Sequence, residues 1–145
     1  MPILWIAHRI HACEKMSVAS TIVKNTFEKI FTNLVKEMDA PVGKLLIGIY
    51  YHKGQQRFEV FNHLKKEKDI DISEYCGALI DWSGGSIIIE TTIAQAGAKY
   101  AKELSVDSDD IKIIMQYKEK CLPNAVLMAK GEKVRNINIE REFLT

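Results

Sequence analysis

Residues 17–51, SVASTIVKNTFEKIFTNLVKEMDAPVGKLLIGIYY, contain a long helix pattern, its end and the strand that follows. From Val18 to Met38 the apolar residues recur in steps of three, four and one, which places them on one stripe of a helix. Ser17 can cap the start of this helix by accepting from a free backbone N–H. The residue before Pro41 is pushed out of the α region, so the helix is expected to end there.

Strand patterns follow the helix. Residues 45–51 are apolar and β-prone, residues 53–56 (Lys-Gly-Gln-Gln) predict a turn, and residues 57–61 alternate polar and apolar like a half-exposed strand. Residues 62–74 are rich in charge and predict a surface loop. This first half therefore predicts a helix followed by a hairpin.

The second half repeats the order of strand, helix and strand. Residues 75–82 predict a strand, and Ser86 can cap a second helix whose break is expected at residues 107–110 (Asp-Ser-Asp-Asp). A further strand is expected at residues 111–117 and a closing hairpin at residues 124–140. The second helix is predicted to bury one face that carries Ile87, Ile88, Thr91, Ala94, Ala98, Ala101 and Leu104.

With a short strand at residues 3–7, the outline becomes two β-α-β units in a single domain of residues 1–145. We expect an α+β fold in which one mixed sheet carries two helices on one face, with right-handed parallel crossovers. The other face would be exposed although its strands carry apolar residues. An uncovered apolar sheet face usually forms an interface, so a homo-oligomer is expected.

Composition narrows the class of protein. Twenty Lys and Arg against nineteen Asp and Glu give a net charge of +1, which disfavours general nucleic-acid binding. Three cysteines without a CxxC pair predict buried or bystander thiols in a reducing, cytoplasmic compartment. Residues 2–7 are too short for a signal-peptide core, and no stretch approaches a membrane span. His8, His11, Cys13 and Glu14 match no standard zinc spacing, so no metal is expected.

Three short segments stand at expected element boundaries along residues 2–117. They are Met1-Pro2-Ile3 at a strand start, Asp39-Ala40-Pro41 at a helix end, and Gly84-Gly85 before a second helix. This order resembles the tautomerase superfamily, in particular its long-chain branch with macrophage migration inhibitory factor and 5-carboxymethyl-2-hydroxymuconate isomerase. The resemblance implies a tautomerase or isomerase that acts on a small keto acid or enol, without a cofactor, as a homotrimer.

The resemblance makes Pro2 the catalytic base once Met1 is removed. Apolar surroundings would lower the pKa of its amine, so that a neutral amine could take a proton beside a carbonyl. Where the family places cations for the substrate carboxylate, this chain has Ala40 and Leu46. The residues expected to line the substrate site instead are Arg9, Lys36, Lys44, Ile80, Lys112 and Tyr117.

Two alternatives stay open. Ala40 and Leu46 are consistent with a non-catalytic oligomeric scaffold or binding protein that keeps the fold and lacks the site. The order helix, hairpin, helix and three strands is similar to profilin- or roadblock-like adaptors, in which residues 1–10 would be a tail and residues 44–61 an antiparallel hairpin.

Overall fold

The computed structural model describes residues 17–75 and 85–144. The elements in chain order are α2 (Val18–Met38), the 3-10 turn η1 (Val42–Lys44), β1 (Leu45–His52), β2 (Gln55–Asn62), β3 (Lys65–Ile70), the 3-10 turn η2 (Ile72–Tyr75), α3 (Gly85–Leu104), the 3-10 turn η4 (Ser108–Asp110), β4 (Ile111–Gln116), β5 (Asn124–Ala129), β6 (Glu132–Ile137) and α4 (Ile139–Phe143). The predicted α+β class is confirmed.

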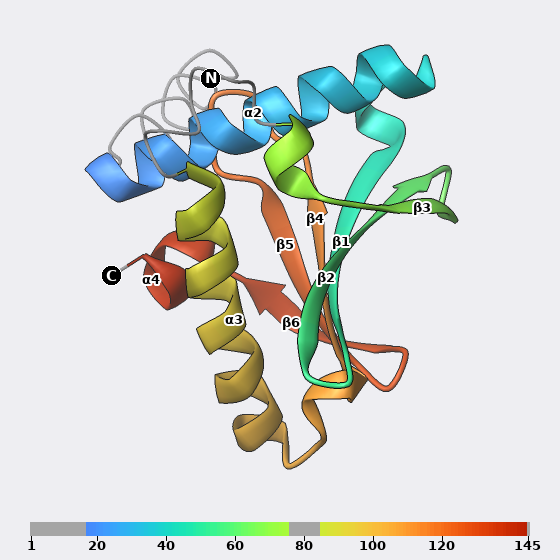
Figure 1. Ribbon diagram of the computed structural model, residues 1–145. Helices are drawn as coiled ribbons and strands as arrows, with labels where there is room; N and C mark the ends of the chain where they lie inside the picture. Colours follow the sequence, from blue (N-terminus) through green and yellow to red (C-terminus); the bar gives the residue numbers. More distant parts are fainter. Residues whose placement is uncertain (1–16, 76–84, 145) are drawn as a thin grey trace, which may run out of the picture.

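The six strands form one sheet in the order β3-β2-β1-β4-β5-β6, and all five pairings are antiparallel. The helices α2, α3 and α4 lie on one side of this sheet (Figure 1). Residues 3–7, the expected first strand of the first β-α-β unit, lie outside the described residues. Residues 75–82, expected to open the second unit, do so too except for Tyr75, which ends η2 instead of starting a strand. In the described part of the chain the sheet is therefore antiparallel rather than mixed.

The first helix forms where the sequence predicts it. Ser17 Oγ accepts from the Ser20 N–H at 3.1 Å, and Asp39 ends the helix in a left-handed conformation with φ of 49°. The predicted apolar stripe is buried in the core at Val23, Phe27, Ile30, Phe31 and Leu34, but its first residue, Val18, is exposed. The predicted strands at 45–51, 57–61 and 111–117 are likewise confirmed. The hairpin predicted at 124–140 forms over residues 124–137, and α4 starts at Ile139 instead.

Residues 62–74 are not a loop, because they contain β3 and η2. Lys68 on β3 holds Glu37 of α2 through an Nζ–Oε1 distance of 2.8 Å, and Tyr75 Oη donates to Glu37 Oε2 at 2.6 Å. These contacts with a distant helix stabilise a strand that its lysine-rich sequence does not favour.

The buried face of α3 differs in part from the predicted one. Ala101 and Leu104 pack half-buried against the core as predicted, but Thr91 and Ala98 are exposed, whereas Ile89, Ala96 and Tyr100 are buried. The side chains of Ile87, Ile88 and Ala94 lie outside the described part of the structure. A Cβ on Gly97 would lie 2.3 Å from Tyr51 Cζ, so α3 crosses β1 closely at this glycine. The sequence offers two stripes of small residues here, and packing on Tyr51 selects the one that includes Gly97.

All three two-residue hairpin turns place both of their residues at positive φ. The β1–β2 turn is Lys53-Gly54 and the β5–β6 turn is Lys130-Gly131, each with glycine second, but the β2–β3 turn is His63-Leu64. The Asp109 carboxylate supports the β1–β2 turn by accepting from the Lys53 and Gly54 N–H groups at 2.8 and 3.0 Å. These hydrogen bonds lower the pKa of Asp109. The two lysine–glycine turns follow the usual chemistry of a type I′ hairpin.

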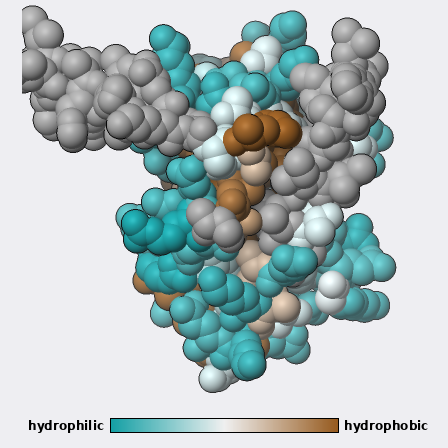
Figure 2. Space-filling view, turned by 90° about the vertical axis from the view of Figure 1, so that its left-hand side faces the viewer, coloured by the Kyte–Doolittle hydropathy of each residue, from teal (hydrophilic) through white to brown (hydrophobic). Residues whose placement is uncertain are grey.

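Figure 2 shows the side of the molecule on which α3 and α4 lie, where hydrophilic residues cover much of the surface and hydrophobic ones form a narrow central strip. Cys121 is buried, with 8% of its surface exposed, which agrees with the prediction of buried or bystander cysteines, but it is disulfide-bonded rather than a thiol.

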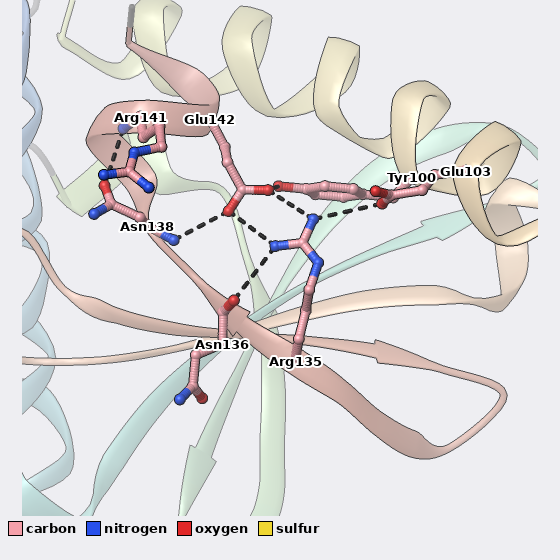
Figure 3. A network of polar contacts seen from close by, with 7 residues as sticks. All are labelled: Tyr100, Glu103, Arg135, Asn136, Asn138, Arg141 and Glu142. Atoms are coloured by element: carbon pink, nitrogen blue, oxygen red, sulfur yellow. Dashed lines mark hydrogen bonds and ion pairs between the residues drawn. The ribbon is translucent and has the colours of Figure 1, made fainter.

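A polar network fastens α4 to α3 and β6 (Figure 3). Arg135 donates to both carboxylate oxygens of Glu142, at 2.7 and 3.0 Å, and the buried Tyr100 donates its hydroxyl to the same carboxylate at 3.0 Å. Asn138 caps α4 by accepting from the Arg141 N–H at 2.9 Å. The hydrogen bonds from Arg135 lower the pKa of Glu142 although partial burial opposes this.

Glu142→Gln is expected to lower the free energy of unfolding at pH 7 by about 2 kcal/mol, because it removes a charge-assisted pair of hydrogen bonds. A carboxyl with a lowered folded pKa stabilises the fold above its unfolded pKa of about 4.3, and this contribution disappears as the pH falls through the folded value. Urea unfolding at pH 7 and at pH 3 should therefore show a difference between variant and wild type that is smaller at pH 3 than at pH 7. The exposed Glu132→Gln serves as control, and a difference as large at pH 3 as at pH 7 would contradict the assignment.

Candidate binding surface on the open face of the sheet

One face of the sheet, named here the open face, carries none of the described helices. The strand register arranges its side chains in three rows, each running from β3 or β2 toward β6. The first row is Lys66, Phe61, Leu46, Gln116 and Asn124; the second is Asp69, Glu59, Gly48, Ile114, Val126 and Asn136; the third is Arg57, Tyr50, Lys112, Met128 and Lys133.

The centre of the open face is apolar and its rim is polar. A band of half-buried side chains crosses all three rows, consisting of Phe61, Leu46, Ile114, Val126 and Met128. Exposed polar residues stand at the ends of the rows, among them Lys66, Asn124, Asn136, Arg57 and Lys133. An apolar centre within a charged rim is the usual anatomy of a protein–protein interface.

A buried carboxylate lies beside this band. The Glu59 side chain is 3% exposed, with Lys112 Nζ 2.8 Å from its Oε2 and Lys66 Nζ 3.3 Å from its Oε1. Gly48 provides the space, since a Cβ there would lie 2.8 Å from Glu59 Oε2. The two lysines compensate a charge that would otherwise be costly to bury.

Aromatic rings hold the two lysines in place. Lys66 Nζ lies 5.1 Å from the Tyr50 ring centroid, and Lys112 Nζ lies 5.5 Å from that of Phe61, both within cation–π range. Burial lowers the pKa of Lys66, but hydrogen bonds to Asp69 and Glu59 outweigh it and the net shift is upward. Lys66 therefore stays charged near neutral pH, and we call the group of Tyr50, Glu59, Phe61, Lys66, Asp69 and Lys112 the Glu59 cluster.

A hollow of about 400 Å³ opens beside Leu46 and Gln116 of the first row. It is lined by Gly43, Lys44, Leu46, His63, Leu64 and Gln116. The Leu64 side chain stands at its edge and is 82% exposed. The His63 N–H donates to the Lys44 carbonyl at 3.1 Å, which ties the β2–β3 turn to η1. The described lining contains no Asp or Glu.

The residues predicted for a substrate site fall in different places. Lys112 belongs to the Glu59 cluster and Lys44 lines the hollow, but Lys36 is exposed on α2, in the helix layer. Tyr117 packs edge-on against Phe31 of α2, with ring centroids 5.6 Å apart. Pro2, Arg9 and Ile80 lie outside the described residues.

Lys44 and Lys112 do not converge on one point. Lys44 immediately precedes β1, whereas Lys112 pairs with Tyr50, six positions further along the chain. At about 3.3 Å per residue the two backbone positions are roughly 20 Å apart, which is too far for both lysines to hold one small carboxylate.

Sequence reasoning missed Glu59, Lys66 and Leu64. The alternation of residues 57–61 does place Glu59 opposite the core side, yet nothing local indicates that two lysines from other strands bury it. Lys66 belongs to the stretch predicted as loop. Leu64 could have been found by comparing the hairpin turns of this chain, because the turns Lys53-Gly54 and Lys130-Gly131 have glycine where His63-Leu64 has leucine.

No protein-family model, no curated protein and no solved structure matches this chain. In the described ranges, no group of three or more His, Cys, Asp or Glu side chains is placed to hold a metal ion. A membrane-spanning helix is likewise not found among the helices that the structure describes.

Proposed function

We propose that this chain is a non-catalytic adaptor that binds an acidic partner protein on its open face. The observation that carries the proposal is the apolar band framed by cations. The open face carries four cationic side chains, Arg57, Lys66, Lys112 and Lys133, and two carboxylates, Glu59 and Asp69. These six groups give the open face a net charge of about +2. The described order of elements, with its hairpin at residues 45–62, also agrees with the outline of a profilin- or roadblock-like adaptor.

The size of the open face is sufficient for such a complex. Six strands about 4.8 Å apart and six residues long at about 3.3 Å give roughly 500 Å² as a flat area, and side-chain relief adds to it. A complex would thus bury roughly 1,000–1,200 Å² in total, near the lower limit for specific interfaces. We therefore expect a reversible complex that weakens with added salt.

Val126→Glu is expected to weaken binding of an acidic amphipathic peptide at least tenfold, because it places a carboxylate in the middle of the apolar band. The probe is a fluorescein-labelled peptide with glutamate and leucine at helical spacing, measured by fluorescence anisotropy. Val18→Glu, at a side chain that is 78% exposed in the helix layer, is the matched control and should bind like wild type. Equal binding by the two variants would refute the open face as the docking surface.

The homo-oligomer predicted from the sequence is a separate occupant of the same face. Two copies would bring like charges together, so self-association through the open face should strengthen with salt. Light scattering on the Val126→Glu variant and wild type, at low and high salt, separates self-association from binding of an acidic partner.

The second candidate is the cofactor-independent tautomerase that the resemblance implies, acting on a small keto acid or enol as a cytoplasmic homotrimer. The hollow favours it, because Lys44 and Leu46 offer a cation beside an apolar wall. Pro2 would be the base only after removal of Met1. Mass spectrometry of the purified protein and a keto–enol assay on Pro2→Ala test this candidate; retained Met1, or an unchanged rate, would reject it.

A further inference from the structure

Leu64 occupies a backbone conformation that its residue type disfavours. Its φ is 67°, in the left-handed region, and it is the second residue of the β2–β3 turn. The other two hairpins have glycine at this position, with φ of 77° and 80°. A side chain there clashes with the following carbonyl, so glycine is the favourable residue.

Burial does not compensate for this strain. Leu64 is 82% exposed, the highest value among the exposed large hydrophobic residues Val18, Leu64 and Val134. Its side chain is neither packed in the core nor masked by a neighbour. Non-glycine residues in the left-handed region cluster at ligand-binding sites, where the strain has a role.

The surroundings of Leu64 define the chemistry of an occupant. The hollow beside it has an apolar wall at Leu46, a cation at Lys44 and an amide at Gln116. Lys65 follows the turn directly and is exposed, whereas the next residue, Lys66, is ion-paired with Glu59 and Asp69. Positive charge next to apolar surface, without a lining carboxylate, is complementary to an acidic side chain that lies next to an apolar one.

We propose that the His63-Leu64 turn is the anchoring point of an acidic partner segment on this adaptor. Leu64 packs against an apolar side chain of the segment, and Lys44 forms an ion pair with a neighbouring carboxylate seated in the hollow. The inference rests on the proposed adaptor function. It adds that Leu64 provides the main contact with the partner and that the partner segment carries a carboxylate next to an apolar side chain.

Leu64→Gly separates this role from a structural one. The substitution gives the turn the chemistry of its two sister hairpins, so the variant should melt about 2–4 °C above wild type. The same variant should bind the labelled Glu/Leu peptide at least tenfold more weakly, because the anchor is gone. Loss of binding with a gain in stability is the expected result, and a lower melting temperature would overturn the strain argument.

Lys44→Glu tests the ion pair, with Lys36→Glu as the matched control that changes net charge by the same amount on the exposed side of α2. Lys44→Glu should weaken binding of the Glu/Leu peptide at least tenfold. It should improve binding of a second labelled peptide, the Lys/Leu peptide, in which lysine replaces every glutamate. Lys36→Glu should bind both peptides like wild type. Equal losses in the two variants would show general electrostatics and overturn the proposed anchor.

The same binding measurements also distinguish failure of this inference from failure of the adaptor proposal. If wild type binds neither peptide, both proposals fail. If Val126→Glu weakens binding while Leu64→Gly and Lys44→Glu bind like wild type, the open face is the docking surface and the turn is not its anchor.

Discussion

Gly97→Ala is expected to lower the free energy of unfolding by about 1–3 kcal/mol, although alanine is the better helix former by up to about 1 kcal/mol. The new Cβ would meet Tyr51 Cζ and Oη at 2.3 Å. Tyr51 is only 6% exposed, so its ring cannot swing into solvent without opening the packing between α3 and β1. Urea unfolding of both proteins measures the difference.

Two further variants identify the cause of this loss. Gly43→Ala meets no atom within 4 Å and should change stability little. Tyr51→Leu removes the ring atoms that clash, so the loss caused by Gly97→Ala should be smaller in the Tyr51→Leu background than in wild type. A Gly97→Ala protein as stable as wild type would show that α3 moves away from β1 without cost.

Lys112→Met is expected to cost about 2–3 kcal/mol, because Glu59 is 3% exposed and would keep only the longer contact to Lys66. Lys66→Met should cost less, since Lys66 is 43% exposed and its distance to Glu59 is 3.3 Å against 2.8 Å for Lys112. Urea unfolding at pH 7 tests both single variants.

The double variant Glu59→Leu/Lys112→Met identifies why Lys112→Met loses stability. The cause is either the lost attraction between the two charges or the Glu59 carboxylate that is left buried with less compensation. Replacement of both partners by apolar residues is often nearly neutral, so the double variant should recover most of the stability that Lys112→Met loses. Strictly additive losses would mean that Glu59 and Lys112 are not energetically coupled.

The sequence predicted those elements whose local pattern and tertiary role agree. The helix from Val18 to Met38 has a cap, a continuous apolar stripe and a proline after its end, and all three appear in the structure. The strand of residues 45–51 and the hairpin around Lys130-Gly131 carry equally clear signals.

Other elements depend on contacts that no local pattern shows. β3 forms because Lys68 meets Glu37 and because β2 offers an unpaired edge, neither of which a lysine-rich stretch predicts. The buried face of α3 cannot be read from the sequence, because alanine occurs on several sides of the helix. Contact with Tyr51 of β1 determines which side packs on the sheet.

The candidate surface was predictable in outline only. An uncovered sheet face with apolar residues was expected, and Lys44 and Lys112 were singled out among the cations. Their separation could not be foreseen, because it follows from the antiparallel pairing of β1 with β4. A parallel first strand, which the expected β-α-β unit requires, would have brought different residues together.

Among the described strands, β3 and β6 lie at the two edges of the sheet and limit how the proposed partner could approach. An outer strand presents unpaired backbone N–H and C=O groups to which a foreign strand could add, and closely spaced lysines discourage such pairing. β3 has lysine at three of its six positions, and β6 carries Lys133 and Arg135. Extension of the described sheet by added strands is thus disfavoured at both sides, so the proposed complex is expected to have a fixed stoichiometry rather than to grow into a fibre.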